Sequence, residues 1–230
     1  MNKMKSISAI LIFSFLVIFS SCDTENGKST PDTKKTSLLI MLYDISKSND
    51  TYGILKEEHL EKIYDQIAFN GGGKFYAFHI KSNSLDQEAI EYVIPAFDTL
   101  QLIGNPYQIK NRRKENQAIL ESFAPERQKF ISGVSQELII PKTEGFTDIK
   151  NAMQLAKTTL EQKNFTSWSK HLLIISDGKN DLPPVNGVDP LAPIELNNVN
   201  VVMVRATNSD YISGSKPLLT NSINDGIDNL

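Results

Sequence analysis

Five oxygen-bearing side chains, at three points of the chain, have the chemistry to bind one metal ion. Asp44 is followed at alternate positions by Ser46 and Ser48, Thr147 stands in a polar segment, and Asp177 precedes a glycine. Carboxylate and hydroxyl oxygens are hard ligands, which suit Mg²⁺ or Mn²⁺ better than Zn²⁺. The same residue types are also common in turns, because their side chains hydrogen-bond to the nearby main chain.

Two of these three points follow directly on short apolar runs. Residues 38–43 carry no charge and end at Asp44, and residues 172–175 are all Leu or Ile and end at Ser176-Asp177-Gly178. Runs of this length and content are typical of strands buried on both faces of a parallel sheet. Because ligands of an open α/β sheet bind at the carboxyl ends of its strands, both carboxylates are expected at one edge of the sheet.

The third point is a loop that leads into a helix. Residues 142–148 are mostly polar, and an apolar stripe then predicts a helix from Ile149 to about Gln162. Thr147 and Asp148 are good capping residues for that helix, so capping alone is an alternative explanation for them.

The other patterns predict an α/β fold with a doubly wound, mostly parallel central sheet flanked by helices. Residues 207–230 are polar and weakly patterned, with at most a short helix from Pro217. His79 lies inside a predicted strand and is interpreted as structural, because no second His or Cys has the spacing of a metal partner. The remaining expected elements are a helix at 56–69, an antiparallel hairpin of 74–81 and 89–97, and a strand at 199–204. Residues 107–138 are expected to form either two helices divided at Pro125 or one helix kinked there, and residues 191–196 at most a short helix.

The amino terminus has the features of a targeting segment. Lys3 and Lys5 precede the apolar stretch Ile7 to Phe19, which predicts a signal peptide over residues 1–21, with an uncleaved membrane anchor as the alternative. Phe19-Ser20-Ser21-Cys22 resembles the lipobox of bacterial lipoproteins, with Phe19 in place of the usual Leu. The resemblance implies acylation of Cys22, and hence a lipid anchor in the bacterial cell envelope, at the outer membrane or the cell surface.

The net charge and the cysteine count bear on which partners and which kinds of covalent or metal site are possible. Removal of residues 1–21 takes away two lysines and no acid, so the net charge changes from −3 to −5. That charge does not favour nucleic acid or an anionic bilayer as a partner. Cys22 is the only cysteine, which excludes disulfides and zinc-thiolate sites from the mature chain. The basic cluster at 111–115 is interpreted as a solvated helix face, because opposite charges follow it.

The chain after the predicted signal peptide is expected to consist of a tether and one domain. Residues 22–36 are rich in Thr, Lys, Asp, Gly and Pro, which predicts a flexible tether, and residues 37–230 are a suitable length for one domain.

The order strand, Asp-x-Ser-x-Ser, helix, then a Thr loop before a helix, then strand and Asp-Gly resembles the von Willebrand factor type A (vWA) domain. That family carries a metal-ion-dependent adhesion site, and the matching positions here are Asp44, Ser46, Ser48, Thr147 and Asp177. The resemblance implies that the three hydroxyls bind the cation directly, whereas the two carboxylates act mostly through water. It also implies an open coordination position, which an acidic side chain of a protein partner can fill.

The preferred function is therefore a membrane-anchored binding module with a divalent cation and no catalytic residues. One alternative is a Mg²⁺-dependent hydrolase that uses Asp44 as nucleophile or base, and another is a metal-free scaffold. Catalysis requires a positioned acid or base near the metal. His59 is not obviously placed for that role, and His171 is expected before its strand, at the end opposite Asp177.

Overall fold

The computed structural model describes residues 34–47, 54–179, 193–207 and 209–230. A compact unit extends from Lys34 to Leu230. The signal peptide, Cys22 and Ser48 lie outside the described residues, so the predictions made for them are not tested by the structure. Within the described ranges, no helix is long and apolar enough to cross a membrane.

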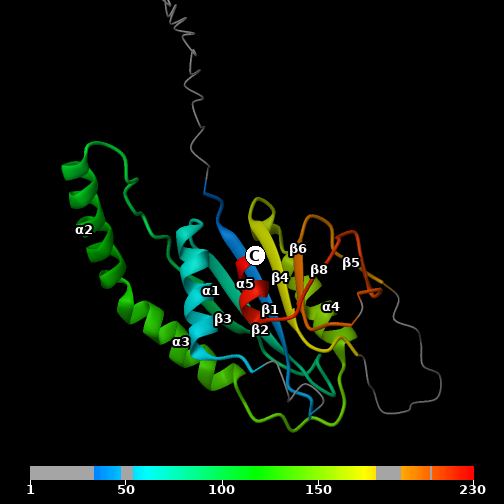
Figure 1. Ribbon diagram of the computed structural model, residues 1–230. Coiled ribbons are helices and arrows are strands. Elements are labelled where there is room, and N and C mark those ends of the chain that lie inside the picture. Colours follow the sequence, from blue (N-terminus) through cyan, green and yellow to red (C-terminus); the bar gives the residue numbers. More distant parts are fainter. Residues whose placement is uncertain (1–33, 48–53, 180–192, 208) are drawn as a thin grey trace, which may run out of the picture. The chain divides into compact units, whose positions relative to one another are not determined.

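A six-stranded sheet forms the centre of the domain, in the order β3-β2-β1-β4-β6-β8. All neighbouring strands are parallel except β2 and β3, which form an antiparallel pair at one edge. The predicted fold class is thus confirmed, including the parallel core and the hairpin edge (Figure 1). The strands are β1 (Ser37–Asp44), β2 (Gly73–Ile80), β3 (Ile90–Ile94), β4 (Ser169–Ile175), β6 (Asn200–Val204) and β8 (Leu218–Thr220).

Helices cover both faces of this sheet. One face carries α1 (Glu57–Phe69), α3 (Ala124–Leu138) and α5 (Ile223–Asp228), and the other carries α4 (Ile149–Leu160) (Figure 1). Side chains of a strand alternate between the two faces, so the apolar run 38–43 of β1 supplies both cores. Its odd-numbered residues 39, 41 and 43 pack in the first core and its even-numbered residues 38, 40 and 42 in the second.

A further helix, α2 (Pro106–Ser122), precedes α3 and buries none of its residues. The helices are separated at Phe123, and Pro125 occupies the first turn of α3, where its missing N–H costs no helical hydrogen bond. The region thus forms two helices, one of the two predicted arrangements, and the boundary lies two residues before Pro125.

Three predictions differ from the structure. The expected helix near 191–196 is wrong for residues 193–196, where Ile194–Glu195 forms the short strand β5 and pairs with β7 (Ile212–Ser213). Burial of Ile194 and Leu196 around exposed Glu195 has the period of a strand. The weakly patterned tail contains both β8 and α5, rather than at most one helix. His171 lies inside β4 rather than before it.

Candidate metal-binding site

Asp44 ends β1 as a fully buried carboxylate, and each of its two oxygens accepts a hydrogen bond. Its Oδ1 accepts from the Ser46 N–H at 2.8 Å, and its Oδ2 accepts from the Ser176 hydroxyl at 2.7 Å. The second bond joins the end of β1 to the end of β4, which run side by side with Tyr43 opposite Ile175. These two bonds orient the Asp44 carboxylate between its own turn and the end of β4.

Ser176 is a functional residue that the sequence reasoning missed. It is fully buried, and its hydroxyl oxygen also accepts the Gly178 N–H at 3.1 Å. Gly178 has a φ of +78°, a conformation that favours glycine, and it shapes the turn after β4. The available signal was the position of a serine between a buried strand and Asp177.

The loop that carries Thr147 is attached to the ends of two strands. Ser46 pairs with Glu144 in an isolated parallel bridge, and the Lys47 N–H donates to the Glu144 carbonyl at 3.1 Å. The Asp148 N–H donates to the carbonyl of Lys81, just after β2, at 3.0 Å. Main-chain bonds therefore hold residues 144–148 beside the carboxyl ends of β1 and β2.

The side chain of Glu144 adds to this attachment. Its Oε2 accepts the Ser82 N–H at 3.1 Å and also the Ser82 hydroxyl. The hydroxyl bond is the main reason that the pKa of Glu144 lies below its usual range. Nothing in the spacing of Ser82 and Glu144 predicted this pair, because they lie in different loops.

Helix capping accounts for Asp148 but not for Thr147. Asp148 is the N-cap of α4, and its Oδ1 and Oδ2 accept from the Asn151 main-chain N–H at 3.2 Å and side-chain Nδ2 at 2.7 Å. Thr147 is buried beside it and is not the capping residue. The alternative that both residues are caps therefore applies only to Asp148.

Asp177 lies two residues beyond β4 and interacts within its own turn. Its Oδ1 accepts the Lys179 N–H at 3.0 Å, and the Lys179 ammonium lies 3.6 Å from its Oδ2. Lys179 is largely exposed, so its side chain is free to rotate away. Burial, and secondarily the charge of Asp177, raises the pKa of Tyr211 well above its usual value. Among the described residues, the buried Tyr211 hydroxyl has no hydrogen-bond partner.

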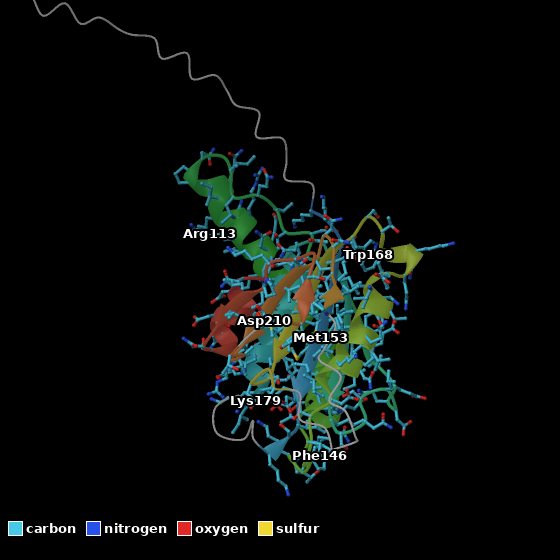
Figure 2. All side chains as sticks on the ribbon, turned by 90° about the vertical axis from the view of Figure 1, so that its right-hand side faces the viewer. Arg113, Phe146, Met153, Trp168, Lys179 and Asp210 are labelled. Carbon is cyan, nitrogen blue, oxygen red and sulfur yellow. The ribbon has the colours of Figure 1, made fainter. Side chains whose placement is uncertain are left out.

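The structure thus brings the three segments to one end of the sheet. Direct hydrogen bonds join Asp44 to Ser46 and to the β4 end, whereas the Thr147 loop is attached through Glu144. In Figure 2, Phe146, which directly precedes Thr147, and Lys179, which follows Asp177 by two residues, lie toward the same end of the domain.

The donor set here is made only of oxygens. Asp44, Ser46 and Thr147 are buried, and no sulfur or imidazole accompanies them in the segments described above. In the described part of the chain, no group of three or more His, Cys, Asp or Glu side chains is placed to hold a metal. The predicted set contains two carboxylates and depends on hydroxyls, which suits a hard cation such as Mg²⁺.

No known sequence family and no curated protein matches the chain. Three of the solved structures with a similar fold are 12–14% identical to it. Proximal thread matrix protein 1 of the mussel byssus, with a zinc-occupied MIDAS motif, has a TM-score of 0.39 over 84% of this chain and 46% of that chain. The SpRpn10 VWA domain has a TM-score of 0.38 over 81% and 87%, and manganese-loaded Plasmodium vivax TRAP protein has 0.39 over 85% and 72%. The chain thus spans less than half of the mussel chain.

Proposed function

We propose that this chain is a vWA-type module that recognises a protein partner through a divalent cation. The cation is held by Asp44, Ser46, Ser48, Thr147 and Asp177. The observation that carries the proposal is the set of hydrogen bonds that join the end of β1, the 144–148 loop and the end of β4 at one end of the sheet. The sequence order of the three segments, which resembles the vWA family, supports it independently.

Each ligand type has a distinct task in this proposal. The hydroxyls of Ser46, Ser48 and Thr147 are neutral donors to Mg²⁺ or Mn²⁺, and the carboxylates of Asp44 and Asp177 supply negative charge near the ion. When bound, the cation offers a coordination position to an acidic side chain of the partner. Asp44 fixes the Ser46 main chain by accepting its N–H, and this bond orients the first hydroxyl.

Burial of Asp44 favours a binding module over a hydrolase. A nucleophile must reach its substrate, but Asp44 has no exposed surface and both oxygens already accept hydrogen bonds. His171 lies in the first half of β4, away from the carboxyl end, and Nδ1 of His59 accepts the Lys56 N–H at 3.0 Å. Neither histidine supplies the acid or base that metal-assisted hydrolysis needs.

The module is also proposed to be lipid-anchored through Cys22 in the bacterial cell envelope, at the outer membrane or cell surface. The lipobox resemblance of residues 19–22 supports this location. Residues 22–36 then act as a tether between the anchor and the domain.

Calorimetric titration of the chain from residue 23 onward with Mg²⁺ tests the site. Ser46→Ala removes one hydroxyl donor but keeps the main-chain N–H that Asp44 accepts. We therefore expect at least about a tenfold loss of Mg²⁺ affinity, equivalent to roughly 1.4 kcal/mol, with little change in the melting temperature in EDTA. Ser132→Ala is the matched control, because Ser132 is exposed on α3 and remote from the site residues in sequence.

A pull-down with the same proteins tests the partner. Wild type and Ser132→Ala should capture it in Mg²⁺ and release it in EDTA, whereas Ser46→Ala should capture much less. Equal Mg²⁺ affinity in Ser46→Ala and wild type would show that the serine is an ordinary loop residue. Retention of the partner in EDTA would favour the metal-free scaffold.

A further inference from the structure

Residues 98–122 form an arm that is held together by its own hydrogen bonds. The Asn116 side chain bonds the main chain of Leu100 in both directions, with Leu100 N–H to Oδ1 at 2.7 Å and Nδ2 to the Leu100 carbonyl at 2.9 Å. Arg112 Nη1 donates to the Gln101 carbonyl at 2.7 Å. The inner side of α2 is therefore engaged by the preceding segment, although no residue of α2 is buried.

The outer side of α2 is basic. At 100° per residue, Lys110, Arg113 and Lys114 lie on the side opposite to Arg112 and Asn116. All three cations are exposed. They share this side with Tyr107, Gln117 and, in the last turn, Glu121, which accepts a hydrogen bond from Gln117 Nε2 at 2.9 Å. Among the described residues, no acidic side chain lies within salt-bridge distance of the three cations.

The turn that begins the arm's helix exposes apolar side chains. Leu102, Ile103 and Tyr107 are 46%, 59% and 72% exposed, and they surround Gly104, whose φ is +114°. Two large aliphatic residues and an aromatic ring are thus exposed within six residues, in the turn before α2 and in its first turn. We call these three exposed residues the apolar tip. Lys110 and Lys114 follow about one and two helical turns after Tyr107, so basic side chains lie next to the apolar tip.

The position of the arm limits what it can contact. Its base follows Phe97, whose carbonyl accepts the Lys34 ammonium at 3.1 Å. The described chain therefore starts beside the arm, and the eleven residues between Cys22 and Lys34 span at most about 40 Å. The arm is also remote from the candidate metal site, since Arg113 and Phe146 lie at opposite ends of the domain in Figure 2.

We propose that the arm binds the surface of an anionic lipid bilayer, with its apolar tip in the headgroup region and its cations on the lipid phosphates. Exposed apolar residues next to Lys and Arg are the combination that binds such surfaces. The negative charge of the whole chain does not oppose this locally, because charges are screened over about 8 Å at physiological salt. A second copy fits less well, because pairing two arms through this side would oppose like charges.

The test uses the chain from residue 23 onward, which contains both hydrophobic cores and no cysteine. Co-sedimentation is measured with vesicles of phosphatidylcholine alone and with added phosphatidylglycerol. We expect binding to the anionic vesicles to weaken at least about tenfold when the three cations are reversed, because each contributes to attraction by the surface. The arm variant is Lys110→Glu, Arg113→Glu, Lys114→Glu, and the charge-matched control is Lys129→Glu, Lys163→Glu, Lys216→Glu.

A second measurement asks whether the tip inserts. Because no cysteine remains after Cys22, Ile103→Cys can carry a single environment-sensitive dye. Its emission should shift to the blue on anionic vesicles. Leu85→Cys is the matched control, since Leu85 is an exposed aliphatic residue in the turn after β2, at the carboxyl end of the sheet. The dye on Leu85→Cys should not shift.

Three outcomes would overturn the proposal. One is equal vesicle binding by the arm variant and the charge-matched control, and another is equal binding of the wild type to both kinds of vesicle. The third is a wild-type dimer in analytical ultracentrifugation that the arm variant loses, which would assign the arm to self-association. None of these measurements involves Mg²⁺, so they are independent of the metal site.

Discussion

At the scale of single residues, the proposed ligand Asp44 depends on a neighbour, Ser176, that is not itself a proposed metal ligand. Asp44 is buried, and burying a carboxylate is costly unless hydrogen bonds compensate it. Ser176 provides one of these bonds and also accepts the Gly178 N–H, so one hydroxyl connects Asp44 to the turn that contains Asp177. The orientation of both carboxylates should therefore respond to Ser176.

Replacement of Ser176 by alanine tests this connection. The change removes the donor to Asp44 Oδ2 and leaves the Gly178 N–H without its acceptor. A hydrogen bond to a charged group contributes about 1.5–3 kcal/mol, so we expect a loss of that size in urea denaturation, together with weaker Mg²⁺ binding. Ser132→Ala should change neither quantity. Wild-type stability and affinity in Ser176→Ala would mean that Asp44 needs no such support.

The sequence predicted the candidate ligands but not their supports, for a physical reason. Asp44 and Asp177 follow apolar runs, and a strand end at a sheet edge is a local pattern that one segment reveals. Ser82 and Glu144 meet only because their loops are adjacent in the folded chain. Such contacts between distant segments leave no periodic signal in either one.

At the scale of elements, the pairing of β1 with β2 requires a residue without a side chain at Gly73. Ser37 lies opposite Gly73, and a Cβ there would approach the Ser37 carbonyl oxygen to 1.9 Å. Because that atom belongs to the main chain of β1, relief requires the two strands to separate. Gly145, in the Thr147 loop, offers a contrast, because a Cβ there would meet no atom within 4 Å.

We predict that Gly73→Ala destabilises the domain by about 3 kcal/mol, the upper range for overpacking in a core. Gly145→Ala should change stability by less than about 0.5 kcal/mol, as for a surface substitution. Urea denaturation of both variants in EDTA measures the effect without any contribution from metal. Equal midpoints for the two variants would contradict the strand pairing at Ser37 and Gly73.

Continuous apolar runs explain which strands could be predicted from the sequence. Strands β1, β4 and β6 each contain a continuous apolar run, at 38–43, 172–175 and 201–204, and buried parallel strands give this signal. The edge strand β8 consists of Leu218, Leu219 and Thr220, none of which is buried, and α5 has only six residues. Elements this short and exposed lack a recognisable pattern, which is why the sequence indicated at most a short helix from Pro217 and not the strand β8.

At the scale of the whole domain, the proposed metal site and the proposed lipid-binding arm lie at opposite ends. The candidate metal site lies at the carboxyl end of the parallel strands, whereas the arm starts beside Lys34, where the described chain begins. The proposed anchor, Cys22, precedes the described chain by eleven residues of sequence.

Cys22→Ser tests the anchor in cells. The variant lacks the thiol that is acylated, so it should take up no fatty-acid analogue and should leave the membrane fraction. Each buried methylene of an acyl chain contributes about 0.8 kcal/mol, so the anchor should dominate the attachment, and the arm should add only a weak contribution that high salt removes. Ser29→Ala, in the predicted tether, should remain labelled and membrane-bound. Salt-resistant membrane association of unlabelled Cys22→Ser would contradict the lipid anchor and indicate that Ile7 to Phe19 is retained as an uncleaved anchor.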